Sequence, residues 1–173
     1  MPQTKSPHIV VMGVGNILLR DEGAGVRAMQ LLNSRYELPE NVDLVDGGVL
    51  GLNLMAILER ADHLILFDCV RGGGNPGDIH HFDYGEIPPR VTYKDSLHQI
   101  DFVEVMSVLP LTAQPPRTVV IGVEPENMEP WGIELSPAVE ASLERMVEIA
   151  LDELDKLSVE AILRKEPLPV EGV

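Results

Sequence analysis

Short apolar segments recur along the chain and are separated by longer stretches of mixed apolar and polar residues. Residues 8–14 are continuously apolar, which is typical of a strand buried on both faces of a parallel sheet. Residues 42–48, 63–70 and 117–125 are predicted to be further strands. Residues 79–84 alternate polar and apolar positions, which favours an antiparallel strand at the edge of the sheet. The pattern therefore predicts five strands.

Four amphipathic segments separate these strands and predict helices. The first begins near Asp21, which we expect to be its N-cap. The second covers residues 52–61. The third follows Ser96, which forms a capping-box pattern with Gln99. The last follows Ser136, an expected N-cap with a proline after it.

Strands separated by helices predict an α/β fold, which we expect to be a three-layer sandwich with a mostly parallel five-stranded sheet and one antiparallel edge strand. With 173 residues, of which 45% are hydrophobic, the chain is long enough for one core. We expect one domain over residues 1–173, with an ordered core at about residues 8–157 and a flexible tail from Arg164. Ligands of such sheets bind beyond the carboxyl ends of the strands, and one strand ends near Asp68.

The net charge and the cysteine content of the chain indicate which partners and which cellular compartment to expect. The chain has 13 lysines and arginines against 28 acids, a formal net charge of −15 at pH 7. This acidity argues against nucleic acid and anionic membranes as partners. The single cysteine, Cys69, excludes an intramolecular disulfide and suits a reducing compartment. Because we find neither a signal peptide nor a long apolar span, we expect a cytoplasmic protein.

The stretch VMGVGNILLRDEG, residues 11–23, places a glycine turn between the first strand and the first helix. It has the outline of a dinucleotide-binding fingerprint, but Leu18 stands where the third glycine is expected. Asp21 and Glu22 follow where phosphates would require amide donors and no negative charge. A dinucleotide-binding oxidoreductase, which would use this turn and Asp46, is therefore a weak alternative.

Three residues near the expected crevice carry groups that bind metals. Asp68 interrupts an apolar strand at its carboxyl end, and a buried carboxylate there requires a hydrogen-bond partner, a cation or solvent. Glu22 is ambiguous, because the helix dipole favours an acid in a first turn without any ligand. His98 also lies in a first turn, which keeps its ring neutral and able to bind metal, although a solvated histidine is the slightly better interpretation of that residue alone. Two carboxylates and one imidazole suit nickel, zinc or another divalent cation.

Six motifs, in this order, resemble those of the maturation endopeptidases of nickel-iron hydrogenases. They are GVGNILLRDEGAGV, VDGGVLGLNL, LILFDCV, SLHQ, GVEP and WGIELSP, and the resemblance runs from about residue 8 to about residue 154. Members of that family remove a short C-terminal extension from the hydrogenase large-subunit precursor once nickel has been inserted. The resemblance implies an endopeptidase whose partner is this precursor, and whose nickel is carried by the substrate, with zinc or another divalent cation able to replace it in vitro.

The resemblance also implies roles for individual residues. The family's three nickel-contacting positions match Glu22, Asp68 and His98, which are the catalytic candidates as well. Five further residues are expected to lie against the substrate: Gly15, Asn16, Asp46, Gly47 and Gly48. The nickel either polarises a carbonyl or a water, or it only permits docking while a carboxylate such as Asp68 acts as general base, as in an aspartyl protease.

Some alternatives stay open, and others are disfavoured. A non-catalytic nickel chaperone would use the same three ligands. Cys69 is not expected to be a nucleophile, because adjacent side chains on a strand point to opposite faces. His80 and His81 diverge for the same reason, and we expect both on the strand surface. The glycine-rich stretch RGGGNPGD is expected to be a flexible loop beside the crevice. The segment around Trp131 is either a packed turn or part of a substrate rim, with equal support.

Overall fold

The computed structural model describes residues 6–48, 54–89, 91, 97–129 and 131–170, without the side chains of residues 97–101. The main elements are β1 (Ile9–Val14), α1 (Ala24–Arg35), β3 (Val42–Gly48), α2 (Met55–Leu58), β4 (His63–Cys69), β5 (Ile79–Asp83), α3 (Leu97–Val108), β6 (Arg117–Val123) and α4 (Pro137–Lys156). Shorter elements are η1 (Arg20–Gly23), β2 (Tyr36–Glu37), η3 (Tyr84–Glu86), η4 (Leu109–Leu111) and β7 (Ile162–Leu163).

The five predicted strands form one sheet in the order β3-β1-β4-β6-β5. The first four are parallel, and β5 pairs with β6 in the antiparallel direction at the edge of the sheet. Both features confirm the prediction. A separate antiparallel pair joins β2 to β7.

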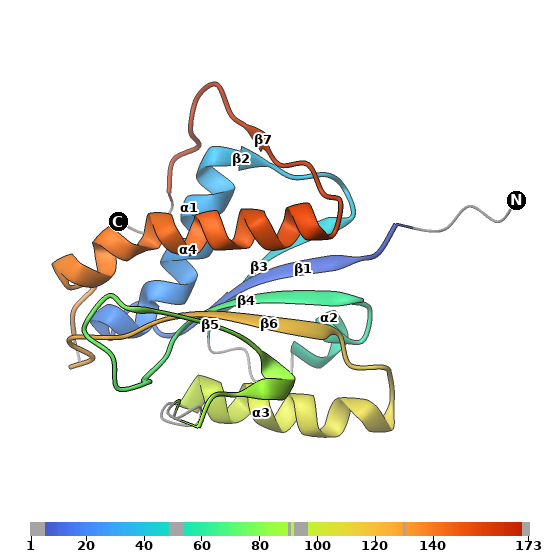
Figure 1. Ribbon diagram of the computed structural model, residues 1–173, viewed down its shortest axis with the longest axis horizontal. Helices are drawn as coiled ribbons and strands as arrows, with labels where there is room; N and C mark the ends of the chain where they lie inside the picture. The colour runs from blue at the N-terminus through green and yellow to red at the C-terminus, as the bar shows by residue number, and fades with distance from the viewer. Residues whose placement is uncertain (1–5, 49–53, 90, 92–96, 130, 171–173) are drawn as a thin grey trace, which may run out of the picture.

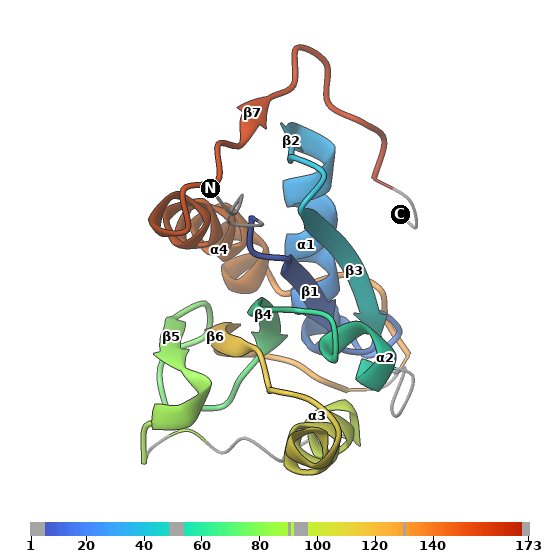
Figure 2. The same ribbon diagram turned by 90° about the vertical axis from the view of Figure 1, so that its right-hand side faces the viewer.

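Helices cover both faces of the sheet, with α1 and α4 on one face and α2 and α3 on the other (Figures 1 and 2). Alternation along the strands produces the two cores, because successive side chains point to opposite faces. Ile9 and Val11 of β1 pack with α1 and α4, whereas Val10 and Met12 pack with α2 and α3. The predicted three-layer α/β sandwich is thus confirmed. None of the helices that the structure describes is both long and apolar enough to span a membrane.

Two helix predictions were inaccurate. Asp21 is not the N-cap of α1, because a turn of 3-10 helix, η1, precedes the helix and Asp21 lies inside that turn. The predicted helix at residues 52–61 is shortened to α2, because the N–H groups of Arg60 and Ala61 bond three residues back and end the helix in a turn. By contrast, α3 begins at Leu97 and α4 at Pro137, as predicted. The expected N-cap Ser96 lies outside the described residues.

The tail after Arg164, expected to be flexible, is hydrogen-bonded to the carboxyl end of α1. The N–H of Arg164 donates to the carbonyl of Arg35 at 2.7 Å, and the N–H of Leu168 donates to that of Ser34 at 2.9 Å. The hydroxyl of Ser34 donates in turn to the carbonyl of Leu168. These bonds join this part of the tail to α1, and its flexibility stays a prediction.

Candidate functional site

The carboxyl ends of β1 and β4 lie side by side at one end of the sheet (Figure 1). The last pair between these strands is Gly13 with Phe67, so Asp68 lies one residue beyond that pair, level with Val14 at the end of β1. By the alternation along β4, its side chain lies on the face covered by α2 and α3. The carboxylate is buried, and its Oδ1 accepts a hydrogen bond of 2.7 Å from the N–H of Cys69. Asp68 thus occupies the end of the sheet where ligands are expected.

Glu22 comes to the same end of the sheet on η1, which packs against β4. The glycine turn after β1 makes this approach possible. Gly15 has a φ of +124°, and a Cβ on it would lie 1.8 Å from the carbonyl oxygen of Glu22. The N–H of Glu22 donates to the carbonyl of Leu19 at 3.2 Å and closes the turn. The glutamate is buried, like Asp68.

Gly25, in the first turn of α1, holds that helix directly against the two strands. A Cβ on Gly25 would lie 2.4 Å from the carbonyl oxygens of both Val14 and Phe67. No larger residue fits there without moving backbone. The backbones of α1, β1 and β4 therefore meet without intervening side chains, and this contact fixes Glu22, three residues earlier, beside the end of β4.

The negative charges at this end of the sheet act together on Cys69. Burial, and next the charges of Asp68, Asp21 and Glu22, raise the pKa of the Cys69 thiol well above its ordinary value, whereas Arg71 lowers it. Burial is thus the main reason for the raised pKa, and the three carboxylates add to it. Cys69 is buried, as predicted, and its thiol is a poor source of nucleophilic thiolate.

Asp21 is a structural carboxylate that anchors the loop after β6. Its two carboxylate oxygens accept four hydrogen bonds of 2.7 to 2.9 Å, from the N–H groups of Glu126, Asn127 and Ser136 and from the Ser136 hydroxyl. Ser136 occupies the N-cap position of α4, but its hydroxyl binds Asp21 in place of the helix. The adjacent residues Asp21 and Glu22 thus have different surroundings. Asp21 ties Glu126, Asn127 and Ser136 to η1.

The five expected substrate-contacting residues lie around the same turn. Asn16 uses its Oδ1 to accept the N–H of Leu18 at 3.0 Å, which shapes the turn. Gly48, with a φ of +36°, accepts a bond of 3.3 Å from the N–H of Gly15. Packing inside the protein is enough to explain a glycine at position 47, since a Cβ on Gly47 would lie 2.9 Å from side-chain atoms of Met12 and Val14. Asp46, beside it on β3, is exposed. Their contact with substrate stays a prediction.

His98 belongs to the first turn of α3, but its side chain lies outside the described residues. The structure therefore does not test whether its ring meets the two carboxylates. Among the side chains that are described, no three acids, histidines or cysteines are grouped as metal ligands. The roles of Glu22, Asp68 and His98 as metal ligands stay predictions.

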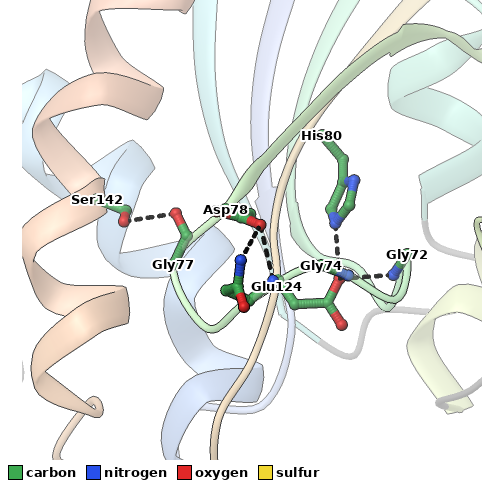
Figure 3. A network of polar contacts seen from close by, with 8 residues as sticks. Gly72, Gly74, Gly77, Asp78, His80, Glu124 and Ser142 are labelled. Atoms are coloured by element: carbon green, nitrogen blue, oxygen red, sulfur yellow. Dashed lines mark hydrogen bonds and ion pairs between the residues drawn. The ribbon is translucent and has the colours of Figure 1, made fainter.

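Glu124, for which the sequence predicted no role, holds the loop between β4 and β5 in place (Figure 3). Its Oε2 accepts hydrogen bonds from the N–H groups of Gly72 at 2.7 Å and Gly74 at 3.2 Å, and contacts Nε2 of His80 at 2.7 Å. Burial alone would raise the pKa of Glu124, but these three hydrogen bonds outweigh it and lower the pKa. The sequence does carry a signal, because Glu124 directly follows a buried strand, just as Asp68 ends one.

The loop that Glu124 holds is also fixed at its far end. The hydroxyl of Ser142 donates to the carbonyl of Gly77 at 2.7 Å, and the N–H of Gly77 donates to the carbonyl of Glu124. His80 is accordingly largely buried, which corrects the expected surface position, whereas His81 contacts Glu153 on another side. The predicted divergence of the two histidines is confirmed.

The chain is similar to known hydrogenase maturation proteins over most of its length. The family model described as hydrogenase maturation protease matches residues 26–153. The hydrogenase 2 maturation protease of Escherichia coli K12 is 42% identical over 160 residues, which cover 91% of this chain and 97% of that protein. The hydrogenase expression/formation protein HupD of Bradyrhizobium diazoefficiens is 41% identical over 172 residues, covering 97% of this chain and 89% of that protein. The solved structure of the hydrogenase maturating endopeptidase HybD from E. coli has a TM-score of 0.84 at 42% identity, covering 91% and 98% of the two chains.

Proposed function

The chain belongs to the hydrogenase maturation protease family, and from this premise we propose that it removes the C-terminal extension of a nickel-loaded large-subunit precursor by recognising the nickel through Glu22, Asp68 and His98. The family resemblance makes it a peptide hydrolase. One observation carries the proposed recognition: two buried carboxylates from distant parts of the chain, Glu22 and Asp68, come to the same end of the sheet.

The chemistry of these groups suits a cation that arrives with the substrate. Burial costs a carboxylate part of its solvation, and a divalent cation bound by both side chains would offset that cost. Carboxylate oxygens with one imidazole nitrogen are suitable ligands for nickel or zinc. Three ligands leave coordination positions for groups of the precursor, so the nickel belongs to the substrate and docks the scissile segment.

Two routes to cleavage fit this arrangement. In the first, the precursor's nickel polarises the scissile carbonyl or a water. In the second, the nickel only docks the substrate, and Asp68 accepts a proton from the attacking water. The hydrogen bond from the Cys69 N–H to Oδ1 orients the Asp68 carboxylate in either route. We place the reaction in the cytoplasm, a reducing compartment that suits a chain with a single cysteine.

The decisive experiment mixes the purified protein with nickel-loaded and nickel-free precursor and measures the mass of the large subunit. We expect a shortened subunit only with nickel. Glu22→Gln and His98→Ala should each slow cleavage by about 100-fold or more while keeping a native circular dichroism spectrum. Glu40→Gln, an exposed acid before β3, is the matched control and should cut normally.

The same experiment separates the alternatives. A nickel chaperone would bind the loaded precursor and leave its mass unchanged. Efficient cutting of the nickel-free precursor would contradict metal recognition, and normal turnover by a folded His98→Ala variant would remove His98 from the mechanism. An oxidoreductase would bind NADH in a fluorescence titration, and we expect no such binding.

A further inference from the structure

Two loops beside the candidate site are joined by backbone pairing and expose apolar side chains. Leu19 and Gly132 form a parallel bridge. The N–H of Arg20 donates to the carbonyl of Gly132 at 2.8 Å, and the N–H of Gly132 donates to that of Leu18 at 3.1 Å. Three large apolar side chains of these loops are exposed: Leu18 to 46%, Trp131 to 81% and Ile133 to 48%. We call these three residues the apolar rim.

The backbone conformation of Trp131 costs the isolated protein free energy. Its φ is +51°, a left-handed conformation that costs of the order of 1–3 kcal/mol for a residue other than glycine. The indole recovers little of this by burial, since most of its surface faces solvent. The Trp131 side chain itself is therefore not packed within the turn. Packing within the protein does not account for the tryptophan.

The rim is rigidly connected to the candidate site. Arg20, which pairs with Gly132, is the first residue of η1, and the same short element carries Glu22. Asp21 between them binds residues on either side of Trp131 through its four hydrogen bonds. The apolar rim therefore lies on loops that are joined directly to the element that carries Glu22.

We propose that Leu18, Trp131 and Ile133 form the surface on which the precursor polypeptide packs next to its scissile segment, with Trp131 as the main contact. This inference rests on the proposed function, because the precursor is the occupant. A side chain as exposed as Trp131 is suited to pack on a protein surface, and tryptophan is enriched among the residues that dominate such contacts. A second copy of the chain on the rim would obstruct the approach to Glu22, which argues for the substrate.

The test compares Trp131→Ala with Leu111→Ala. Leu111 is equally exposed, at 82%, but lies on η4 before β6, at the opposite end of the sheet. With nickel-loaded precursor, Trp131→Ala should raise KM on the order of ten-fold and leave kcat little changed, as expected for a contact residue outside the chemistry. Trp131→Phe should recover most of the affinity, Leu111→Ala should match the wild type, and all three should keep the wild-type melting temperature.

A second measurement does not depend on cleavage. Trp131 is the single tryptophan of the chain, so incorporation of 5-fluorotryptophan gives one fluorine resonance at the rim. Adding unlabelled nickel-loaded precursor should shift or broaden it, even if the precursor is not cut. An unchanged resonance with bound precursor, or equal KM values for Trp131→Ala and Leu111→Ala, would overturn the proposal. A shift that grows with protein concentration alone, together with a dimer mass, would assign the rim to a second copy and also overturn it. Wild-type protein that fails to cut but shows the precursor-dependent shift would refute the proposed function and support the rim.

Discussion

At the scale of single residues, acidic residues that are adjacent in the sequence differ in their surroundings in the folded protein. Asp21 receives four hydrogen bonds from one loop and is explained by architecture. Glu22, the next residue, and Asp68 are buried at the carboxyl ends of β1 and β4, where ligands of this fold class bind. The four hydrogen bonds explain why Asp21 is buried, and the position of Glu22 and Asp68 makes these two residues the candidates for chemistry.

Asp68→Asn should abolish processing, by about 100-fold or more, without lowering thermal stability. Asparagine keeps the shape but loses the charge, and therefore both an anionic ligand and a general base. Stability should stay level or rise, because burying a carboxylate costs more solvation free energy than burying an amide of the same shape. Melting temperature and precursor cleavage are measured on the same preparation. A structural Asp68 predicts the opposite pattern, a clear fall in melting temperature with activity lost only through unfolding.

Cys69→Ser should retain cleavage and lower the free energy of unfolding by about 1–2 kcal/mol. The buried site that raises the pKa of the thiol also desolvates a serine hydroxyl, which is more polar than sulfur. Chemical denaturation and a cleavage assay check the two parts. A folded Cys69→Ser protein without activity would restore the cysteine as a nucleophile.

At the scale of elements, polar side chains at the ends of strands fix the loops that surround the site. β4 ends in a loop that Glu124, after β6, holds through three donors (Figure 3). At the other end of the sheet, His8 precedes β1 and contacts the carbonyl of Arg60 and the carboxylate of Asp43, both at 2.8 Å. Each contact joins segments far apart in sequence.

Glu124→Gln should loosen the loop between β4 and β5. The amide keeps an acceptor oxygen but loses the charge that strengthens bonds from two N–H groups and His80, so we expect destabilisation of about 1–3 kcal/mol. Hydrogen exchange at the Gly72 and Gly74 amides should become faster, as measured by NMR. Glu40→Gln is again the control. Unchanged exchange at both glycines would show that Glu124 does not hold the loop.

His8 should make stability depend on pH near neutrality. The hydrogen bond to the Arg60 carbonyl, and next that to the Asp43 carboxylate, raise the pKa of His8, because only the protonated ring donates from both nitrogens. This stabilisation is complete below the ordinary histidine pKa of about 6.5 and is lost as pH rises through the raised pKa. The wild type should exceed His8→Gln in stability by at most about 1 kcal/mol near pH 6, since Asp43 is half exposed, and by less near about pH 8.5. Thermal melts across this range measure the difference, and a gap independent of pH would contradict the assignment.

At the scale of the whole molecule, periodicity predicted the layers and the sheet because strand and helix periods are local properties. The continuously apolar segments, which are typical of strands buried on both faces, predicted the parallel strands. The weaker alternation at residues 79–84 predicted the antiparallel edge strand β5. The fold rule for open sheets then brought Glu22 and Asp68 to one end, where the structure places them. Their roles, and that of His98, stay predictions that cleavage assays test.

The sequence did not reveal contacts whose partners are distant along the chain. Asp21 looked like a helix cap because the residues that bind it lie more than 100 positions later. The charged and proline-rich composition of the tail likewise does not reveal that its backbone bonds to Ser34 and Arg35. The loop after β4 was predicted to be flexible for the same reason. Its glycines suggest mobility, and the sequence does not reveal that Glu124 binds their N–H groups.

The course of that tail also determines where the protein tolerates additions. After following α1, the chain reaches Val170, which lines the same pocket as Ile133 of the apolar rim. Val173 follows Val170 by three residues, so polypeptide joined after Val173 is tethered beside the surface proposed for the precursor, whereas polypeptide joined before Met1 is tethered through Ser6 to the opposite end of the sheet. An affinity tag after Val173 should raise KM for the precursor, and the same tag before Met1 should not, as parallel cleavage assays of the two tagged proteins would show. Immobilising the enzyme through its amino end should leave the rim open to its substrate.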